Sequence, residues 1–154
     1  MKTANQWLSE YAESHQNETN IWIHTICVPA IFLSIIGLLK TIPFGLDLSF
    51  NIGDFLVPFN INFLSFSVVF IMIFYYRLSS KIFLRMLLFT VLCLVIIHYL
   101  ALTGYLFQIS LAIFIIAWIG QFYGHKVEGK KPSFFKDLQF LLIGPVWVFE
   151  KMFK

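Results

Sequence analysis

Charge is scarce in this sequence of 154 residues, of which Asp, Glu, Lys and Arg make up 12%. A soluble domain usually carries about twice that share of charged residues. Hydrophobic residues make up 59% of the chain and aromatic residues 19%. This composition excludes a water-soluble globule and predicts one integral membrane domain that covers residues 1–154.

Several chemical motifs are also missing. There is no phosphate-binding loop, nucleophile elbow or CxxC pair, so nucleotide hydrolysis and serine-triad acyl transfer have no support. The two cysteines, Cys27 and Cys93, lie inside apolar runs, where thiols behave as small hydrophobic groups. Residues 1–20 lack the apolar core of a cleaved signal peptide, and we expect a short amphipathic helix there instead.

Four apolar runs approach the roughly 20 residues with which a helix crosses a bilayer. They cover residues 21–39, 59–76, 82–100 and 105–123. The segment between the first two runs is rich in Gly, Pro and Asp, which predicts an irregular loop. Gly144 and Pro145 interrupt the segment 133–154, so we expect an interfacial or re-entrant helix there, with a fifth span as the alternative. The predicted fold is an all-α integral membrane protein, a four-helix transmembrane bundle with an N-terminal amphipathic helix.

The positive charges fall almost entirely on one side of this topology. Ten of the eleven Lys and Arg residues lie on the side that holds both termini and the 77–81 loop, and Lys40 alone lies opposite. Lys and Arg favour the cytoplasmic side, so both termini are predicted to be cytoplasmic. This distribution explains the net charge of +3 without nucleic acid. The short loops favour a bacterial inner membrane, or the endoplasmic reticulum if the protein is eukaryotic.

Three of the four histidines fall at one depth on this predicted cytoplasmic face. His15 precedes the first span, His24 lies about 6 Å into it, and His125 follows the end of the fourth. His98 lies about 24 Å away, near the opposite surface, by the same helical rise. His15 and His24 are nine residues apart and converge only if the chain turns between them. Asn17, Thr19 and Asn20 are good capping residues in such a turn, and Asn20 is the suggested N-cap for the span that follows.

The segment "QFYGHKVEGKKP" adds polar groups at the same depth. Gln121 and His125 share a helix face, and the glycines around His125 allow a bend that returns Glu128 toward them. Neutral imidazole is a common metal ligand, and histidines with a nearby carboxylate suit iron with open coordination positions. A metal site is one hypothesis. The alternative is that each histidine is simply a polar residue among the lipid headgroups.

Basic and aromatic residues near the interface have two interpretations. Lys126, Lys130 and Lys131 could attract an anionic headgroup or a substrate carboxylate. They are equally well explained as ordinary positive charge on the cytoplasmic side. The four tryptophans are interpreted as interfacial anchors: Trp7, Trp22, Trp118 and Trp147.

Two blocks carry a specific pattern, "HQNETNIWIHTICVPAIFLS" at 15–34 and "WIGQFYGHKVEGKKPSFFKDLQFLLIGPVWVFE" at 118–150. The first contains H-x8-H with an Asn four residues before the second His, and then V-P. The second contains W-I-x-Q-F-x-G-H and a Gly-Pro segment that ends in Glu. Together they resemble the small membrane family of the fungal endoplasmic-reticulum 2-hydroxy fatty acid dioxygenase. In that family the acidic residue lies one position farther from the His than Glu128 lies from His125.

The resemblance implies an Fe(II)-dependent dioxygenase that shortens 2-hydroxy fatty acids by one carbon, as in fatty acid alpha-oxidation, without 2-oxoglutarate. It implies Fe(2+) as the cofactor, and a 2-hydroxy fatty acid, O2 and membrane lipid as partners. Carried over by position, His15, His24 and His125 would be iron ligands. The side chains beside them would take part in catalysis: Asn20, Gln121 and Glu128.

Two other functions stay open from the residues alone. A metal-ion or proton transporter would place polar ligands along a path through the middle of the membrane. The middles of the predicted spans offer only mild polar groups, at Ser34, Thr90 and Cys93, which counts against transport. In a non-catalytic membrane scaffold, the histidines would be incidental and would hold no metal.

Overall fold

The computed structural model describes residues 3–52, 55–129 and 140–152, and these ranges contain six helices and two strands. The helices are α1 (Ala4–Ala12), α2 (Glu18–Lys40), α3 (Phe63–Leu78), α4 (Ser80–Ala101), α5 (Leu106–Glu128) and α7 (Ile143–Met152). The strands are β1 (Gly45–Ile52) and β2 (Phe55–Asn62). The prediction of an all-α protein is therefore confirmed in its helices, and the two strands are an addition to it.

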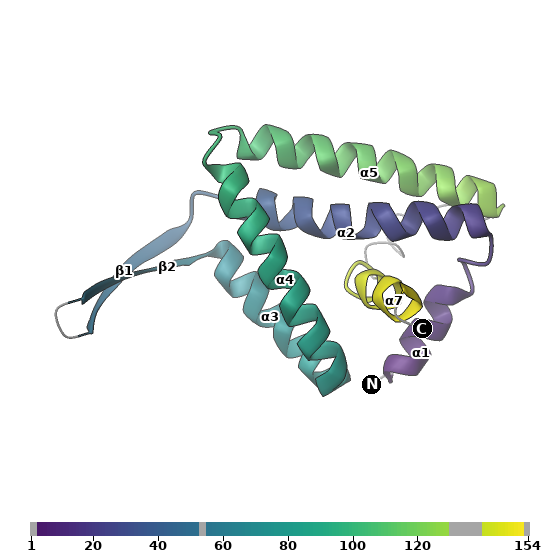
Figure 1. Cartoon of the computed structure of the whole chain (residues 1–154), viewed down its shortest axis with the longest axis horizontal. Coiled ribbons are helices and arrows are strands. Elements are labelled where there is room, and N and C mark those ends of the chain that lie inside the picture. The colour runs from purple at the N-terminus through teal and green to yellow at the C-terminus, as the bar shows by residue number, and fades with distance from the viewer. Residues whose placement is uncertain (1–2, 53–54, 130–139, 153–154) are drawn as a thin grey trace.

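The four long helices form two antiparallel pairs, α2 with α5 and α3 with α4 (Figure 1). The pairs lie close together at the end from which the strands extend, and they diverge toward the other end. α1 and α7 occupy the widening space, where α7 packs against α1, α2 and α4. The predicted four-helix bundle is not confirmed, because these two further helices lie between the pairs.

The segment between α2 and α3 is a β-hairpin, so the prediction of an irregular loop is wrong. β1 and β2 pair antiparallel, from Gly45 opposite Asn62 to Ile52 opposite Phe55, and the ribbon extends away from the helices (Figure 1). Residues 46–52 alternate strictly between apolar and polar types, which is the pattern of a strand. The predicted second span begins too early for the same reason, since α3 starts only after its N-cap Asn62.

Three helices, α2, α4 and α5, are long and apolar enough to cross a membrane. They confirm three of the four predicted spans in length and composition. α3 is also apolar but has 16 residues, which is about 24 Å at the helical rise against roughly 30 Å of hydrocarbon. A crossing by α3 and the cytoplasmic location of both termini therefore stay predictions.

Small residues let α2 and α5 pack closely. A Cβ on Gly37 would clash with Ser110 Oγ, and a Cβ on Gly120 would lie 2.6 Å from Cys27 Sγ. Close backbone approach of this kind is how apolar helices associate in a membrane, where burial from water cannot drive them together. The same close approach continues at Gly124, near the end of α5 that carries His125.

The described part of the C-terminal segment packs against the other helices. α7 has 10 residues, which is too few to cross a bilayer, and its residues from Ile143 to Val148 are buried. Tyr75 OH donates a hydrogen bond of 2.9 Å to the Leu142 carbonyl, and Arg85 of α4 forms an ion pair with Glu150. Residues 130–139 lie outside the described ranges, so an interfacial or re-entrant path for 133–154 stays a prediction.

Both termini are expected on the cytoplasmic face and the β-hairpin on the opposite face, because of the asymmetry of Lys and Arg. In a Cys27→Ala, Cys93→Ala background, a cysteine at position 47 should react with a membrane-impermeant maleimide in intact cells. Cysteines at Thr3 and Met152 should react only after the membrane is opened. If positions 3 and 152 are labelled from opposite sides, the number of crossings is odd and the four-span topology is wrong.

Candidate metal centre

Three histidines from separate parts of the chain meet at one end of the α2–α5 pair. His15 lies in the turn between α1 and α2, His24 in the second turn of α2, and His125 in the last turn of α5. A ring nitrogen from each lies within 4.8 Å of the others, and each residue is at most 4% exposed. Across the described ranges, this is the one group of His, Cys, Asp and Glu side chains found that could hold a metal ion.

The turn between α1 and α2 brings His15 back toward α2. α1 ends at Ala12, whose carbonyl accepts the His15 backbone N–H at 3.0 Å. Asn17 then caps α2, and its side chain accepts the backbone N–H groups of Thr19 and Asn20. The prediction of Asn20 as the N-cap is therefore wrong, because Asn17 offers the same side chain one helical turn earlier.

Gly124 lets α5 lie close enough to α2 for His125 to join the other two rings. A Cβ at this position would clash with Asn20 Oδ1 and would lie 3.2 Å from His24 Cε1. With glycine there, the ring centroids of His24 and His125 are 4.9 Å apart, and those of His15 and His24 are 4.3 Å apart. α5 stays helical through this glycine, so the expected bend at this position is not formed and is not needed.

Backbone carbonyls orient two of the three imidazole rings. Nδ1 of His15 lies 2.6 Å from the Tyr11 carbonyl oxygen, and Nδ1 of His24 lies 3.0 Å from that of Asn20. A carbonyl can only accept, so each Nδ1 donates its proton and the neutral ring presents a lone pair on Nε2. Histidines that bind metals commonly donate their other ring nitrogen to a carbonyl or carboxylate in this way.

This set of donors fits a transition-metal ion. Nε2 of His24 is buried and makes no hydrogen bond to any described residue, which is costly for a polar atom. A metal bonded to that nitrogen would offset the cost. Neutral imidazole suits iron, zinc, copper and nickel. The three histidines are therefore compatible with iron but do not select it among these metals.

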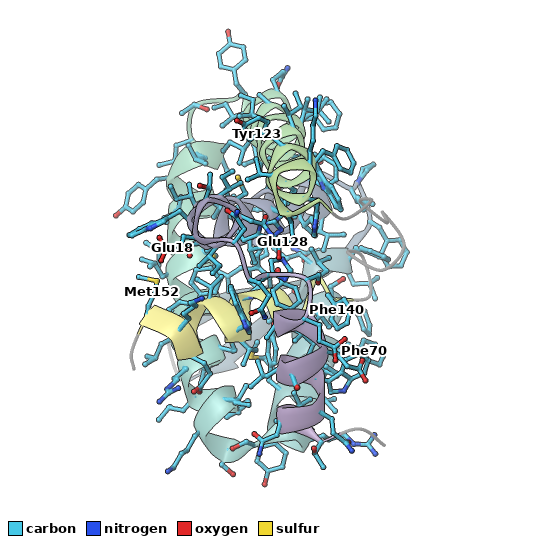
Figure 2. The ribbon with its side chains drawn as sticks, turned by 90° about the vertical axis from the view of Figure 1, so that its right-hand side faces the viewer. Glu18, Phe70, Tyr123, Glu128, Phe140 and Met152 are labelled. Carbon is cyan, nitrogen blue, oxygen red and sulfur yellow. The ribbon has the colours of Figure 1, made fainter. Side chains whose placement is uncertain are left out.

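Glu128 holds the α1–α2 turn against the end of α5. Its Oε1 accepts the Gln16 backbone N–H, and its Oε2 accepts the Asn17 backbone N–H and the Asn20 side-chain amide, each at 2.9 Å. Figure 2 views the molecule from the end at which Glu18 begins α2 and Glu128 ends α5. Three N–H donors occupy the carboxylate, so its contacts are those of a positioning residue beside the cluster.

Asn20 links the segments that carry the three histidines. It is completely buried, and its side-chain amide donates to the Ser14 carbonyl at 3.2 Å as well as to Glu128. Its own backbone carbonyl accepts the Nδ1–H of His24. Ser14 and Glu128 belong to the segments that contain the other two histidines, so Asn20 connects all three.

Tyr11 and Trp147 cover His15. The Tyr11 and His15 rings stack with centroids 4.1 Å apart and planes 9° from parallel, and the Trp147 ring lies 5.3 Å from that of His15. A Cβ on Gly144 would lie 3.2 Å from Tyr11 OH, so α7 meets this tyrosine at its glycine. The predictions that Trp118 and Trp147 are interfacial anchors are wrong, because these residues are 6% and 7% exposed, and Trp147 packs beside the cluster.

The other predicted site residues lie outside the three-histidine cluster. Gln121 is buried and lines a cavity of about 20 Å³ between α2, α5 and the residues that lead into α7. Lys126 is exposed on α5, and Lys130 and Lys131 fall outside the described residues. His98 lies in the last turn of α4, next to the start of α5, whereas the cluster lies at the far end of α5.

The fold and the site together define a class, a helical protein with three helices long and apolar enough to cross a membrane and a candidate metal centre of three buried histidines. The chain belongs to the 2-hydroxy-palmitic acid dioxygenase Mpo1-like family, which it matches over residues 1–154. The resemblance of the two sequence blocks is thereby confirmed. The name of the family suggests a dioxygenase that acts on 2-hydroxy fatty acids. No curated protein and no solved structure matches the chain significantly.

Replacing Glu128 with Ala should weaken metal binding by about 10–100-fold without abolishing it, as is usual for a partner that supports a ligand. The turn that carries His15 would lose the acceptor for the Gln16 and Asn17 N–H groups. Anaerobic titration of the purified protein with Fe(II) measures the affinity. Glu18→Ala is the control, because Glu18 is an exposed carboxylate in the first turn of α2.

Glu128→Gln keeps one side-chain acceptor and should bind Fe(II) more tightly than Glu128→Ala. Complete loss of binding in Glu128→Ala would show that the carboxylate is itself a ligand and that the positioning role is wrong. Binding equal to that of the Glu18→Ala control would show that the turn does not depend on this carboxylate.

Proposed function

We propose that this protein is an Fe(II)-dependent dioxygenase that shortens 2-hydroxy fatty acids by one carbon without 2-oxoglutarate. The observation that carries the proposal is the buried convergence of His15, His24 and His125, whose ring nitrogens lie within 4.8 Å of one another. Membership of the 2-hydroxy-palmitic acid dioxygenase Mpo1-like family supports the substrate class. Three histidines are compatible with several transition metals. We propose iron among them because the reaction uses dioxygen.

The proposed reaction balances with dioxygen as the sole oxidant. The C1–C2 bond of the 2-hydroxy acid breaks, C2 becomes the carboxyl carbon of the shorter acid, and C1 leaves as carbon dioxide. One O2 is consumed and one water is formed. The substrate supplies all four electrons, so a co-substrate such as 2-oxoglutarate is not required.

A bound Fe(II) ion would supply the activation of dioxygen, and His15, His24 and His125 would hold it. The residues around the cluster prepare these ligands before the metal arrives. The Tyr11 and Asn20 carbonyls orient the rings of His15 and His24. All three ligand side chains are buried, which limits the contact of the imidazole rings with bulk water.

The location of the cluster suits a substrate that is dissolved in the bilayer. It lies at one end of α2 and α5, which are long and apolar enough to cross a membrane. α1 and α7, which lead to the two termini, contact each other, and this supports placing both termini on one face. A membrane-bound fatty acid holds its carboxylate at the headgroup level, so its C1 and C2 would lie at the depth of the histidines. A transporter would need such ligands near the midplane.

Purified protein supplied with Fe(II) and O2 should convert 2-hydroxyhexadecanoic acid to the acid one carbon shorter. Mass spectrometry of the products and oxygen uptake measure the conversion, and an iron chelator should stop it. Hexadecanoic acid without the hydroxyl group is the matched control and should not be shortened, because its C2 is not already oxidised. A requirement for 2-oxoglutarate, or equal turnover of the control acid, would contradict the proposed reaction.

A further inference from the structure

An open hollow of about 660 Å³ lies beside the cluster, between α1, the α1–α2 turn and α7. His15 is one of its lining residues, so the hollow borders the candidate metal centre on the side of this histidine. Much of its lining is apolar and comes from three different helices: Leu8, Ala12, Ile21 and Trp147. Its polar lining includes Ser9 and Gln16. The hollow thus offers an apolar surface and a polar surface, which together can bind an amphiphilic molecule.

Two charged residues of α7 line the hollow, and they make different contacts with their neighbours. Glu150 forms an ion pair with Arg85 of α4, which compensates its carboxylate. Lys151 Nζ lies 4.9 Å from the centre of the Trp147 ring, in a cation–π contact. The Trp147 ring lies 5.3 Å from the His15 ring, which places this ammonium group within about 10 Å of the His15 ring.

We propose that this hollow binds the carboxyl end of the 2-hydroxy fatty acid and that Lys151 pairs with its carboxylate. The proposal deepens the proposed function and rests on it. The apolar lining accommodates the first methylenes of the acyl chain, and the opening toward His15 admits C1 and C2. A cation–π contact at an exposed site is weak, and the flexible lysine stem lets Nζ move from the indole to a carboxylate.

The geometry assigns this task to Lys151, whereas the sequence indicates Lys126 together with Lys130 and Lys131, the last two of which lie outside the described residues. Lys126 is exposed on α5 and is not among the residues that line the hollow. Lys151 shares the hollow with His15 itself. A carboxylate bound to Lys151 would therefore lie in the hollow that His15 lines.

Steady-state kinetics with 2-hydroxyhexadecanoic acid test the assignment in the iron-loaded full chain. Lys151→Gln should raise KM by about tenfold or more and leave kcat unchanged, because one charged hydrogen bond to the substrate is lost. Lys151→Arg keeps the charge and should retain most of the affinity. Lys81→Gln is the matched control, because it removes an exposed lysine charge at the start of α4 without touching the hollow.

Tryptophan quenching gives a second measurement that needs neither metal nor turnover. A hexadecanoic acid that is brominated beside its carboxyl group should quench the wild type more than it quenches Trp147→Phe. The concentration that gives half of this quenching should rise about tenfold in Lys151→Gln. The same acid brominated at its far end is the control ligand and should quench Trp147 less.

The two measurements separate failure of the hollow from failure of the reaction. Unchanged KM and unchanged quenching in Lys151→Gln would overturn the assignment, as would an equal effect of Lys81→Gln. If no chain turns over a 2-hydroxy acid but Lys151→Gln still weakens quenching, the hollow binds fatty acid and the proposed reaction is wrong. If turnover occurs and Lys151→Gln has wild-type KM, the reaction stands and the hollow is not its binding site.

Discussion

Three imidazole rings are buried together at the end of two apolar helices. The rest of the structure depends on the contacts that hold these rings close to one another. Their ring nitrogens come within 4.8 Å only because α5 lies against α2 at Gly124, where a Cβ would clash. The turn before α2 must also fold back, and the Glu128 carboxylate holds it by accepting the Gln16 and Asn17 N–H groups. α1 and α7 then cover the cluster from the side where the two helix pairs diverge (Figure 1).

Features that follow from spacing along the chain could be predicted from the sequence. Three apolar runs match helices that are long enough to cross a membrane. The helical rise and the order of the runs placed His15, His24 and His125 at one depth, and the structure brings them into one group. The same reasoning separated His98, which lies at the other end of the long helices. The motifs around these histidines identified the family, which matches over residues 1–154.

Features that depend on contacts between distant segments could not be predicted. Trp147 has the same sequence context as an interfacial anchor, and only the packing of α7 shows that it lies beside His15. Glu128 bonds to backbone N–H groups that lie more than 100 residues earlier in the chain, so its spacing from His125 gives no indication of them. The β-hairpin is different, because residues 46–52 carry both the alternation of a strand and, with their neighbours, the Gly, Pro and Asp content of a loop, and the two patterns predict different structures.

The most direct test is the metal content of the wild type and of four single His→Ala variants, purified in mild detergent with iron supplied. We expect about one iron atom per chain in the wild type and in His98→Ala, since three histidines make one ligand set. His15→Ala, His24→Ala and His125→Ala should each lose the iron and keep the helical circular dichroism of the wild type. Iron retained in His15→Ala, or lost in His98→Ala, would contradict a metal centre at this end of α2 and α5.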